Sequence, residues 1–322
     1  MKKVLLALAV LFALGFAGAE RWDMHVAWPP ANFHTKGVVR FADLVKAKSG
    51  GKLEIVVHPG GALGFKGAEI LRVVRDGTLP IAEVLMGNVQ GDEPIFGLTS
   101  LPLLAGSHDD AWRLYQIAKP YYEKALERNN AMLLYAAPWP PSGLYAKKLL
   151  KSTADFKGLK VRTYDANSAE FVRLLGAEGI AIPFSELYTA LSTGLVNAVL
   201  TSTVTGVDAK LWEVTSYFHR IHYAYPLNMV IVNKAMFERL PKDVQEAVLA
   251  AAKQVEKEQW NNSKKADLSS ELVLKNQGMT VVKNISPELQ EAMKSAAKKL
   301  WDKWLALAGE EGKAIFKAYF GE

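Results

Sequence analysis

The sequence predicts an α/β protein built as two lobes, and three observations support this class. Short apolar or alternating segments recur between amphipathic segments of helical length, which is the order of βαβ units. This pattern restarts after a turn-rich stretch at 138–143, and from Pro241 onward the chain is strongly helical. A length of 322 residues also suits about two domains, on the rule of ~150 residues each.

The first half alternates regularly between the two element types. The helix expected at 35–48 has an apolar stripe that includes Val38, Phe41 and Val45, and the glycines at 50–51 end it. The elements expected in this half are strands at 24–27, 53–57, 81–85 and 132–136, and helices at 35–48, 67–75 and 109–128. This order predicts a largely parallel sheet.

The second half repeats the pattern and then returns. It predicts strands at 159–163, 196–200 and 229–232, helices at 168–175 and 186–193, a helix starting at 208–213, and long helices at 242–275 and 287–319. We therefore expect a signal peptide at 1–19, a first lobe at 20–142, a second lobe at 143–227, and a return to the first lobe with C-terminal helices at 228–322. At least two crossovers between lobes predict a hinge and a cleft.

The first residues predict export. Lys2 and Lys3 precede an apolar run at 4–16, and Ala17-Gly18-Ala19 supplies the small residues that signal peptidase requires. The run is shorter than the ~20 residues that span a bilayer, so we expect cleavage after Ala19 rather than a membrane anchor. The mature chain is expected outside the cytoplasm.

Composition excludes several kinds of chemistry. The chain has no cysteine, which rules out disulfides, cysteine nucleophiles and thiolate metal sites. Its net charge is +6, and loss of Lys2 and Lys3 leaves +4. The nearest approach to a basic patch, Lys147, Lys148 and Lys151, lacks the interleaved aromatics of a nucleic-acid site, and we interpret it as solvated surface. No nucleic-acid partner is expected, although a mildly positive surface attracts anions.

Several motifs carry a family resemblance. The most specific are 155–163 (DFKGLKVRT) and 182–197 (IPFSELYTALSTGLVN), supported by 58–64 (HPGGALG) and 240–245 (LPKDVQ). In these motifs the chain resembles the solute-binding component of tripartite ATP-independent periplasmic (TRAP) transporters, of the dicarboxylate-binding type, over nearly all of its mature length. The resemblance implies a periplasmic binding protein fold whose cleft closes on a small organic acid and whose long helices brace the lobes. It also implies a periplasmic location, no catalysis, and delivery to the membrane subunits of a TRAP permease.

Arg162 is the first candidate for ligand binding. In the family, the arginine of the Gly-Leu-Lys-Val-Arg motif binds the ligand carboxylate, and that arginine corresponds to Arg162. The residue also ends a predicted strand, where ligands of open α/β sheets gather. Its guanidinium matches a carboxylate with two parallel hydrogen bonds. The alternative is an ion pair at the surface, with Asp165 as the partner.

Three polar residues complete the polar part of the predicted site. Thr201 stands at the position where the resemblance to the family implies an asparagine, with Ser202 beside it, and their hydroxyls can still donate to a carboxylate. Asn228 precedes the returning strand. For all three, capping of a strand end or a loop is the alternative.

Aromatic residues suggest the nature of the ligand. Trp28, Trp139, Tyr188 and Trp212 are candidates for one aromatic wall, which would suit an apolar or ring-bearing monocarboxylate. Phe184 is spaced four residues from Tyr188, as on a packed helix face, and we assign it to the core.

Other sites and functions receive less support. His219 and His222 are spaced as on one helix face, but no third ligand at motif spacing completes a zinc site. We expect no cofactor, and no carboxylate pair calls for the ligand-bridging metal that some relatives carry. Nucleophile-elbow and phosphate-loop motifs are missing from the sequence. A secreted hydrolase with distant acidic partners remains an alternative, as does a binding protein that serves an ABC importer or a sensor.

Overall fold

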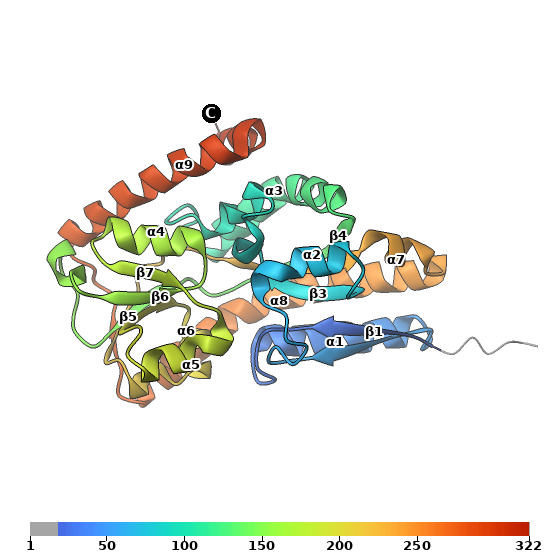
Figure 1. Ribbon diagram of the computed structural model, residues 1–322, viewed down its shortest axis with the longest axis horizontal. Coiled ribbons are helices and arrows are strands. Elements are labelled where there is room, and N and C mark those ends of the chain that lie inside the picture. The colour runs from blue at the N-terminus through green and yellow to red at the C-terminus, as the bar shows by residue number, and fades with distance from the viewer. Residues whose placement is uncertain (1–18, 322) are drawn as a thin grey trace, which may run out of the picture.

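The computed structural model describes residues 19–321, and two β-sheets with helices around them form two lobes side by side (Figure 1). The predicted two-lobed α/β class is therefore confirmed. All but the last residue of the predicted signal peptide lies outside the described residues.

The first lobe contains a five-stranded sheet of order β2-β1-β3-β10-β4. Its strands are β1 (Glu20–His25), β2 (Leu53–His58), β3 (Ile81–Leu85), β4 (Ala131–Pro138) and β10 (Leu227–Asn233). Its helices are α1 (Phe33–Lys48), α2 (Ile70–Arg75), α3 (His108–Arg128) and α7 (Lys234–Arg239), with 3-10 turns η1 (Gly67–Glu69), η2 (Met86–Val89) and η3 (Pro94–Ser100).

The second lobe contains a six-stranded sheet of order β11-β9-β5-β8-β6-β7. Its strands are β5 (Gly143–Ala146), β6 (Lys160–Thr163), β7 (Glu178–Ala181), β8 (Ala198–Thr201), β9 (Tyr217–His219) and β11 (Thr280–Val282). The accompanying helices are α4 (Ala166–Leu174), α5 (Phe184–Ser192) and α6 (Thr203–Asp208), with 3-10 turns η4 (Thr153–Phe156) and η5 (Leu211–Glu213).

Both sheets are mixed, which corrects the expectation of largely parallel pairing. β1 runs parallel to β2 and β3, but β10 is antiparallel to β3 and β4. In the second sheet β5 is antiparallel to β8 and β9, while β6 is parallel to β7 and β8. The reversed strands β5 and β10 each come directly after a crossover between the lobes and enter their sheets from the opposite end, whereas β11, after the crossover along α8, runs parallel to β9.

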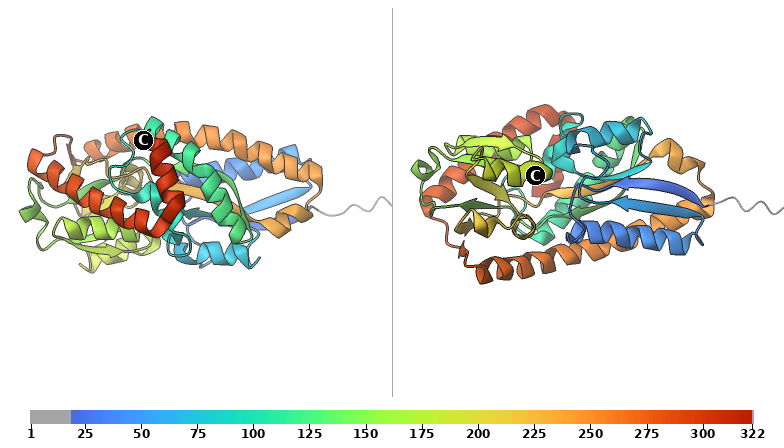
Figure 2. Two further views of the ribbon diagram at one scale, coloured as in Figure 1. Left: turned by 90° about the horizontal axis from the view of Figure 1, so that it is seen from above. Right: turned by 60° about the horizontal axis from the view of Figure 1, so that its bottom comes forward.

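Two long helices brace the lobes from opposite sides (Figure 2). α8 (Lys242–Asn276) packs on α1 and β4 in the first lobe and on α6 and β11 in the second. Its 35 residues span roughly 50 Å at ~1.5 Å per residue. α9 (Pro287–Phe320) packs on α3 and α4, and it kinks at Gly309, whose φ of 60° and ψ of −138° are accessible to glycine.

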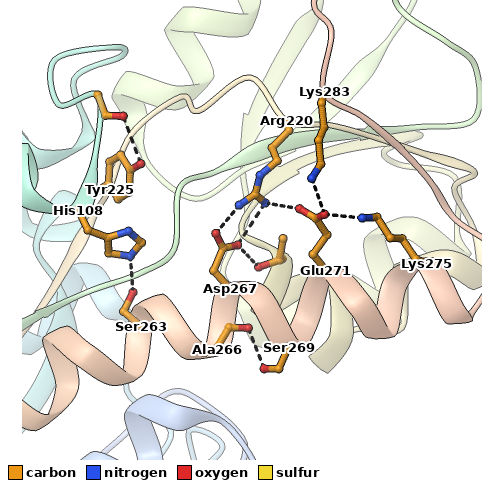
Figure 3. A network of polar contacts seen from close by, with 12 residues as sticks. His108, Arg220, Tyr225, Ser263, Ala266, Asp267, Ser269, Glu271, Lys275 and Lys283 are labelled. Carbon is orange, nitrogen blue, oxygen red and sulfur yellow. Dashed lines mark hydrogen bonds and ion pairs between the residues drawn. The ribbon is translucent and has the colours of Figure 1, made fainter.

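An ionic network fastens the second half of α8 to the other lobe (Figure 3). Arg220, in the crossover between β9 and β10, pairs with Asp267 and lies 3.2 Å from Glu271. Glu271 also contacts Lys275 at 2.7 Å and Lys283 at 3.1 Å. These five side chains join α8 to the crossover and to the segment after β11.

Apolar packing joins the lobes as well. One continuous core cluster includes Phe96 and Tyr115 of the first lobe, Phe171 of the second lobe, and Trp304 of α9. A second cluster, containing Phe41 and Val248, fills the space between the first sheet, α1 and the start of α8. α8 is thus part of the first lobe's core before it reaches the second lobe.

Some local expectations were wrong. A helix was expected to start at 208–213. Instead α6 begins after its cap residue Ser202 and ends at Asp208. The sequence did not indicate this helix, because its β-branched residues have low helix propensity. His219 lies in β9, where Nδ1 contacts the Leu144 carbonyl at 3.0 Å and Nε2 accepts from the Leu150 amide at 2.9 Å. It therefore shares no helix face with His222. Three strands of three or four residues, β5, β7 and β11, were too short to show periodicity.

Candidate ligand site in the cleft

A narrow cavity of about 30 Å³ lies between the two lobes. Strand ends of both sheets reach it, through Leu85 of β3, Arg162 of β6 and Thr201 of β8. This is where ligands of open α/β sheets bind. The lining residues are Trp28, Leu85, Trp139, Ser142, Arg162, Tyr164, Phe184, Thr201, Ser202, Thr205 and Pro226.

A larger hollow, of about 730 Å³, lies between α3 and α8. Its walls contain none of the residues that the sequence singles out for ligand binding, and surface lysines make up much of its polar lining. We therefore take the cleft cavity as the candidate site.

Arg162 is the charged group of this cavity. Its side chain is only 3% exposed, and Nε donates to the carbonyl of Ile182 at 3.0 Å. Among residues 19–321, no hydrogen bond or ion pair engages its two terminal nitrogens. Burial lowers the pKa of Arg162 to about 10. A buried guanidinium with two free donor groups at a cavity wall is suited to receive a carboxylate.

Asp165 is not the ion-pair partner that the alternative interpretation required. Its Oδ1 caps α4 by accepting from the Ser168 amide at 2.8 Å and the Ser168 hydroxyl at 2.6 Å. Burial raises the pKa of Asp165, and the hydrogen bonds from Ser168 oppose that rise. Oδ1 is thus occupied by its own helix, while Oδ2 has no hydrogen-bond partner among the described residues. Asp165 affects Arg162 through its charge but makes no contact that occupies the terminal nitrogens.

Hydroxyl groups line the polar side of the cavity beside Arg162. The hydroxyls of Ser142 and Tyr164 lie 3.1 Å apart, and burial raises the pKa of Tyr164 well above its usual value. Ser202 accepts from the Thr205 amide at 3.2 Å and so caps α6 while also lining the cavity. These groups are neutral donors and acceptors.

Aromatic rings form the other side. Trp28 meets Trp139 edge to face, with ring centroids 4.7 Å apart, and meets Phe184 of the second lobe at 5.8 Å. The indole nitrogen of Trp139 donates to Asn228 Oδ1 at 2.8 Å, which fixes the ring in place. Asn228 is 1% exposed and supports Trp139 without lining the cavity.

The structure brings five of the eight predicted residues to the cavity wall: Trp28, Trp139, Arg162, Thr201 and Ser202. Of the other three, Asn228 lies behind Trp139. Tyr188 is 67% exposed on α5, and Trp212 in η5 packs against an apolar cluster around Tyr145.

Phe184 corrects the assignment to the core, because it starts α5 and lines the cavity with its half-buried ring. Sequence reasoning also missed Leu85, Ser142, Tyr164, Thr205 and Pro226. Ser142 and Pro226 lie in the two short crossovers between the sheets, and Tyr164 follows Arg162 by two residues. Proximity to a crossover was therefore the signal that could have found them.

Two further findings bear on the class of protein. Within residues 19–321, no three His, Asp or Glu side chains form a group that could hold a metal ion. None of the helices in the same range combines the length and the apolar character that crossing a bilayer requires.

The two lobes, the cleft cavity and its buried arginine together define a solute receptor. Residues 24–307 match the family model described as bacterial extracellular solute-binding protein, family 7, and the chain belongs to this family. The resemblance to TRAP solute-binding proteins predicted from the sequence is thereby confirmed.

Solved and curated relatives agree with this placement. The chain is 33% identical to DctP7 of Bordetella pertussis, an extracytoplasmic solute receptor binding pyroglutamic acid, over 94% of this chain and 100% of that one (TM-score 0.91). It is 38% identical to a marine metagenome TRAP solute-binding protein specific for pyroglutamate, over 94% and 99% (TM-score 0.91). The 2,3-diketo-L-gulonate-binding periplasmic protein YiaO of Escherichia coli is 28% identical over 67% of this chain and 66% of its own.

Proposed function

We propose that the protein is a non-catalytic, periplasmic receptor that captures a small monocarboxylate with an uncharged, ring-bearing body and delivers it to a TRAP permease. L-Pyroglutamate is the first candidate. The observation that carries the proposal is the buried Arg162 guanidinium, whose terminal nitrogens make no bond to residues 19–321 at the cavity wall. The ligand carboxylate supplies the missing acceptors and the compensating charge.

The single formal charge among the cavity-lining residues favours a ligand with one negative charge. Arg162 is the one residue with a formal charge among those that line the cavity. A second carboxylate would be buried without a cation, and the ammonium of a free amino acid would be buried without an anion. Either group would lose its hydration uncompensated, at a cost of several kcal/mol. This argument disfavours dicarboxylates and zwitterions.

The lining of the cavity favours a compact ring. The cavity is narrow, at about 30 Å³, so the lobes must part to admit even a small ligand. Trp28, Trp139 and Phe184 offer aromatic surface to a flat apolar body, and the hydroxyls of Ser142 and Ser202 can bond to a neutral amide. Pyroglutamate, a five-membered lactam with one carboxylate, has these features. Relatives described as binding pyroglutamate, at 33% and 38% identity, support the same choice.

The lining residues also favour a receptor over the hydrolase alternative. General acid–base chemistry needs a titratable group within hydrogen-bond reach of the substrate. The residues that line the cavity include no Asp, Glu, His or Lys. The wall holds and orients a ligand without a group suited to transfer its protons.

A matched ligand panel tests the proposal. L-Pyroglutamate, L-proline, L-glutamate and succinate differ in ring, ammonium and second carboxylate, and each is added to the purified protein in a thermal-shift assay followed by calorimetry. We expect L-pyroglutamate to raise the melting temperature, since ligand at 100 times Kd stabilises the folded state by about 2.7 kcal/mol. Larger shifts with succinate or with L-proline would refute the monoanion argument.

A further inference from the structure

A partly buried hydrogen bond joins the two lobes outside the ligand cavity. Asn32 lies in the loop between β1 and α1 of the first lobe, and Asp208 is the last residue of α6 in the second lobe. Asn32 Nδ2 donates to Asp208 Oδ2 at 2.6 Å. Neither residue lines the cavity, although the chain on both sides leads into it through Trp28 and Thr205.

The amide of Asn32 is held in the orientation that this bond requires. Asn32 is the N-cap of α1, and its Oδ1 accepts from the backbone amide of His34 at 2.8 Å. An N-cap side chain must accept a hydrogen bond from the helix backbone. Oδ1 of Asn32 therefore faces α1, and its Nδ2 faces Asp208. The residue is 1% exposed, and water therefore does not compete for the donor.

Asp208 needs this donor when the lobes are together. Burial raises the pKa of Asp208, and the hydrogen bond from Asn32 is the largest effect that opposes the rise, followed by the charges of His34 and Lys36. All of these opposing groups belong to the first lobe. When the lobes separate, water replaces them, and when the lobes close the carboxylate relies on Asn32.

Other contacts across the cleft have different properties. Lys66 and Glu186 lie 3.3 Å apart, but their side chains are 67% and 52% exposed, and such pairs contribute little in water. Trp28 and Phe184 also meet across the cleft, but both line the cavity and would touch the ligand. The bond from Asn32 to Asp208 has a buried donor and a half-buried acceptor, and it is separate from the ligand.

We propose that Asn32 and Asp208 form a closure latch, a pair of positioning residues that stabilises the closed lobes and sets how long a ligand is retained. The proposal rests on the proposed function only in taking the cleft cavity as the ligand site. Because the latch acts on closure, its loss raises the dissociation rate more than it lowers the association rate.

An exchange of the two residues tests the latch. Asp caps helices as well as Asn does, so Asn32→Asp keeps the cap of α1 and places a carboxylate against Asp208. We expect this variant to bind L-pyroglutamate at least tenfold more weakly, mainly through faster dissociation in stopped-flow measurements. The double variant Asn32→Asp/Asp208→Asn restores a donor and an acceptor in reversed order, and we expect it to recover most of the affinity.

Two controls separate the latch from general effects. Glu186→Gln breaks the exposed interlobe pair and should change affinity less than twofold. The chain has no cysteine, so Lys48→Cys with Lys157→Cys allows two dyes, one on each lobe, to report closure by energy transfer. Both sites are exposed. Asn32→Asp should reduce the closed fraction at a given ligand concentration, and the exchanged pair should restore it.

Opposite results overturn the latch. Affinity of Asn32→Asp within twofold of the wild type, or a double variant no better than Asn32→Asp, would show that the contact does not govern closure. If the wild-type protein fails to respond to L-pyroglutamate, the proposed function fails instead. The same variants are then compared with whichever acid of the panel stabilises the protein most.

Discussion

Replacing Arg162 with methionine should weaken ligand binding and stabilise the ligand-free protein at the same time. Burial lowers the pKa of Arg162 from 12.5 to about 10. At 1.36 kcal/mol per pKa unit, this corresponds to a cost of about 3 kcal/mol for the folded protein. Arginine is charged in both the folded and the unfolded chain at neutral pH, so the cost is fully present there and disappears only above about pH 10.

Methionine removes that cost and keeps most of the apolar volume. It also removes the hydrogen bond from Nε to the Ile182 carbonyl, worth about 1 kcal/mol. The ligand-free variant should therefore gain about 1–2 kcal/mol in its free energy of unfolding, or a few degrees in melting temperature. Binding should lose about 2–5 kcal/mol, because the ligand carboxylate is left buried without its partner. That loss is about 30-fold to 4,000-fold in Kd.

Urea unfolding without ligand and calorimetry with L-pyroglutamate measure the two effects. Arg162→Lys is the matched control: it keeps the charge but not the planar fork, so it should lose most of the affinity without the gain in stability. Unchanged affinity in Arg162→Met would remove the residue from the site. A ligand-free variant less stable by more than about 2 kcal/mol would show that Arg162 is mainly structural.

Three further predictions concern the frame of the site. Trp139→Phe should lower the free energy of unfolding by about 1–3 kcal/mol in urea titrations, because Asn228 Oδ1 is left buried without its donor, and an unchanged midpoint would contradict this. Gly206→Ala places a methyl 2.1 Å from the Tyr145 hydroxyl and should cost about 1–3 kcal/mol, whereas a thermal midpoint equal to wild type would mean that the ring moves freely. Burial lowers the pKa of His108 to about 4, so the folded protein binds fewer protons than the unfolded chain, and stability present above pH 6.5 should fall by up to about 3 kcal/mol as the pH approaches 4. His108→Gln should flatten that pH dependence, and an identical slope in the variant would assign it to other groups.

Long periodic segments made most of the fold predictable. The helix expected at 35–48 is α1 (Phe33–Lys48), and those expected at 242–275 and 287–319 are α8 and α9, within two residues at each end. The strand directions were not predictable, because β5 and β10 are reversed after a crossover, whereas β11 follows the crossover along α8 and is not. Local hydrophobic patterns contain no information about which sheet, or which end of it, a strand enters.

The site was predictable where a residue type stands out in its segment. Arg162 ends a strand and Trp139 lies in a proline-rich loop, and both reach the cavity. Tyr188 fits the same aromatic argument, yet α5 turns it outward to 67% exposure. Which face of a short helix meets the cleft depends on the packing of α5 against the second sheet, and a nine-residue sequence does not specify that packing.

α8 gives the molecule a single rigid rod shared by both halves. Asp267, on this rod, accepts a hydrogen bond of 2.8 Å from the Thr203 hydroxyl, one residue beyond the cavity-lining Ser202. A rearrangement at the ligand therefore reaches an outward-facing helix through one intervening residue. A membrane partner that touches both ends of this helix would detect whether ligand is bound without contacting the ligand. The bound state of the receptor would then be detectable at its outer surface.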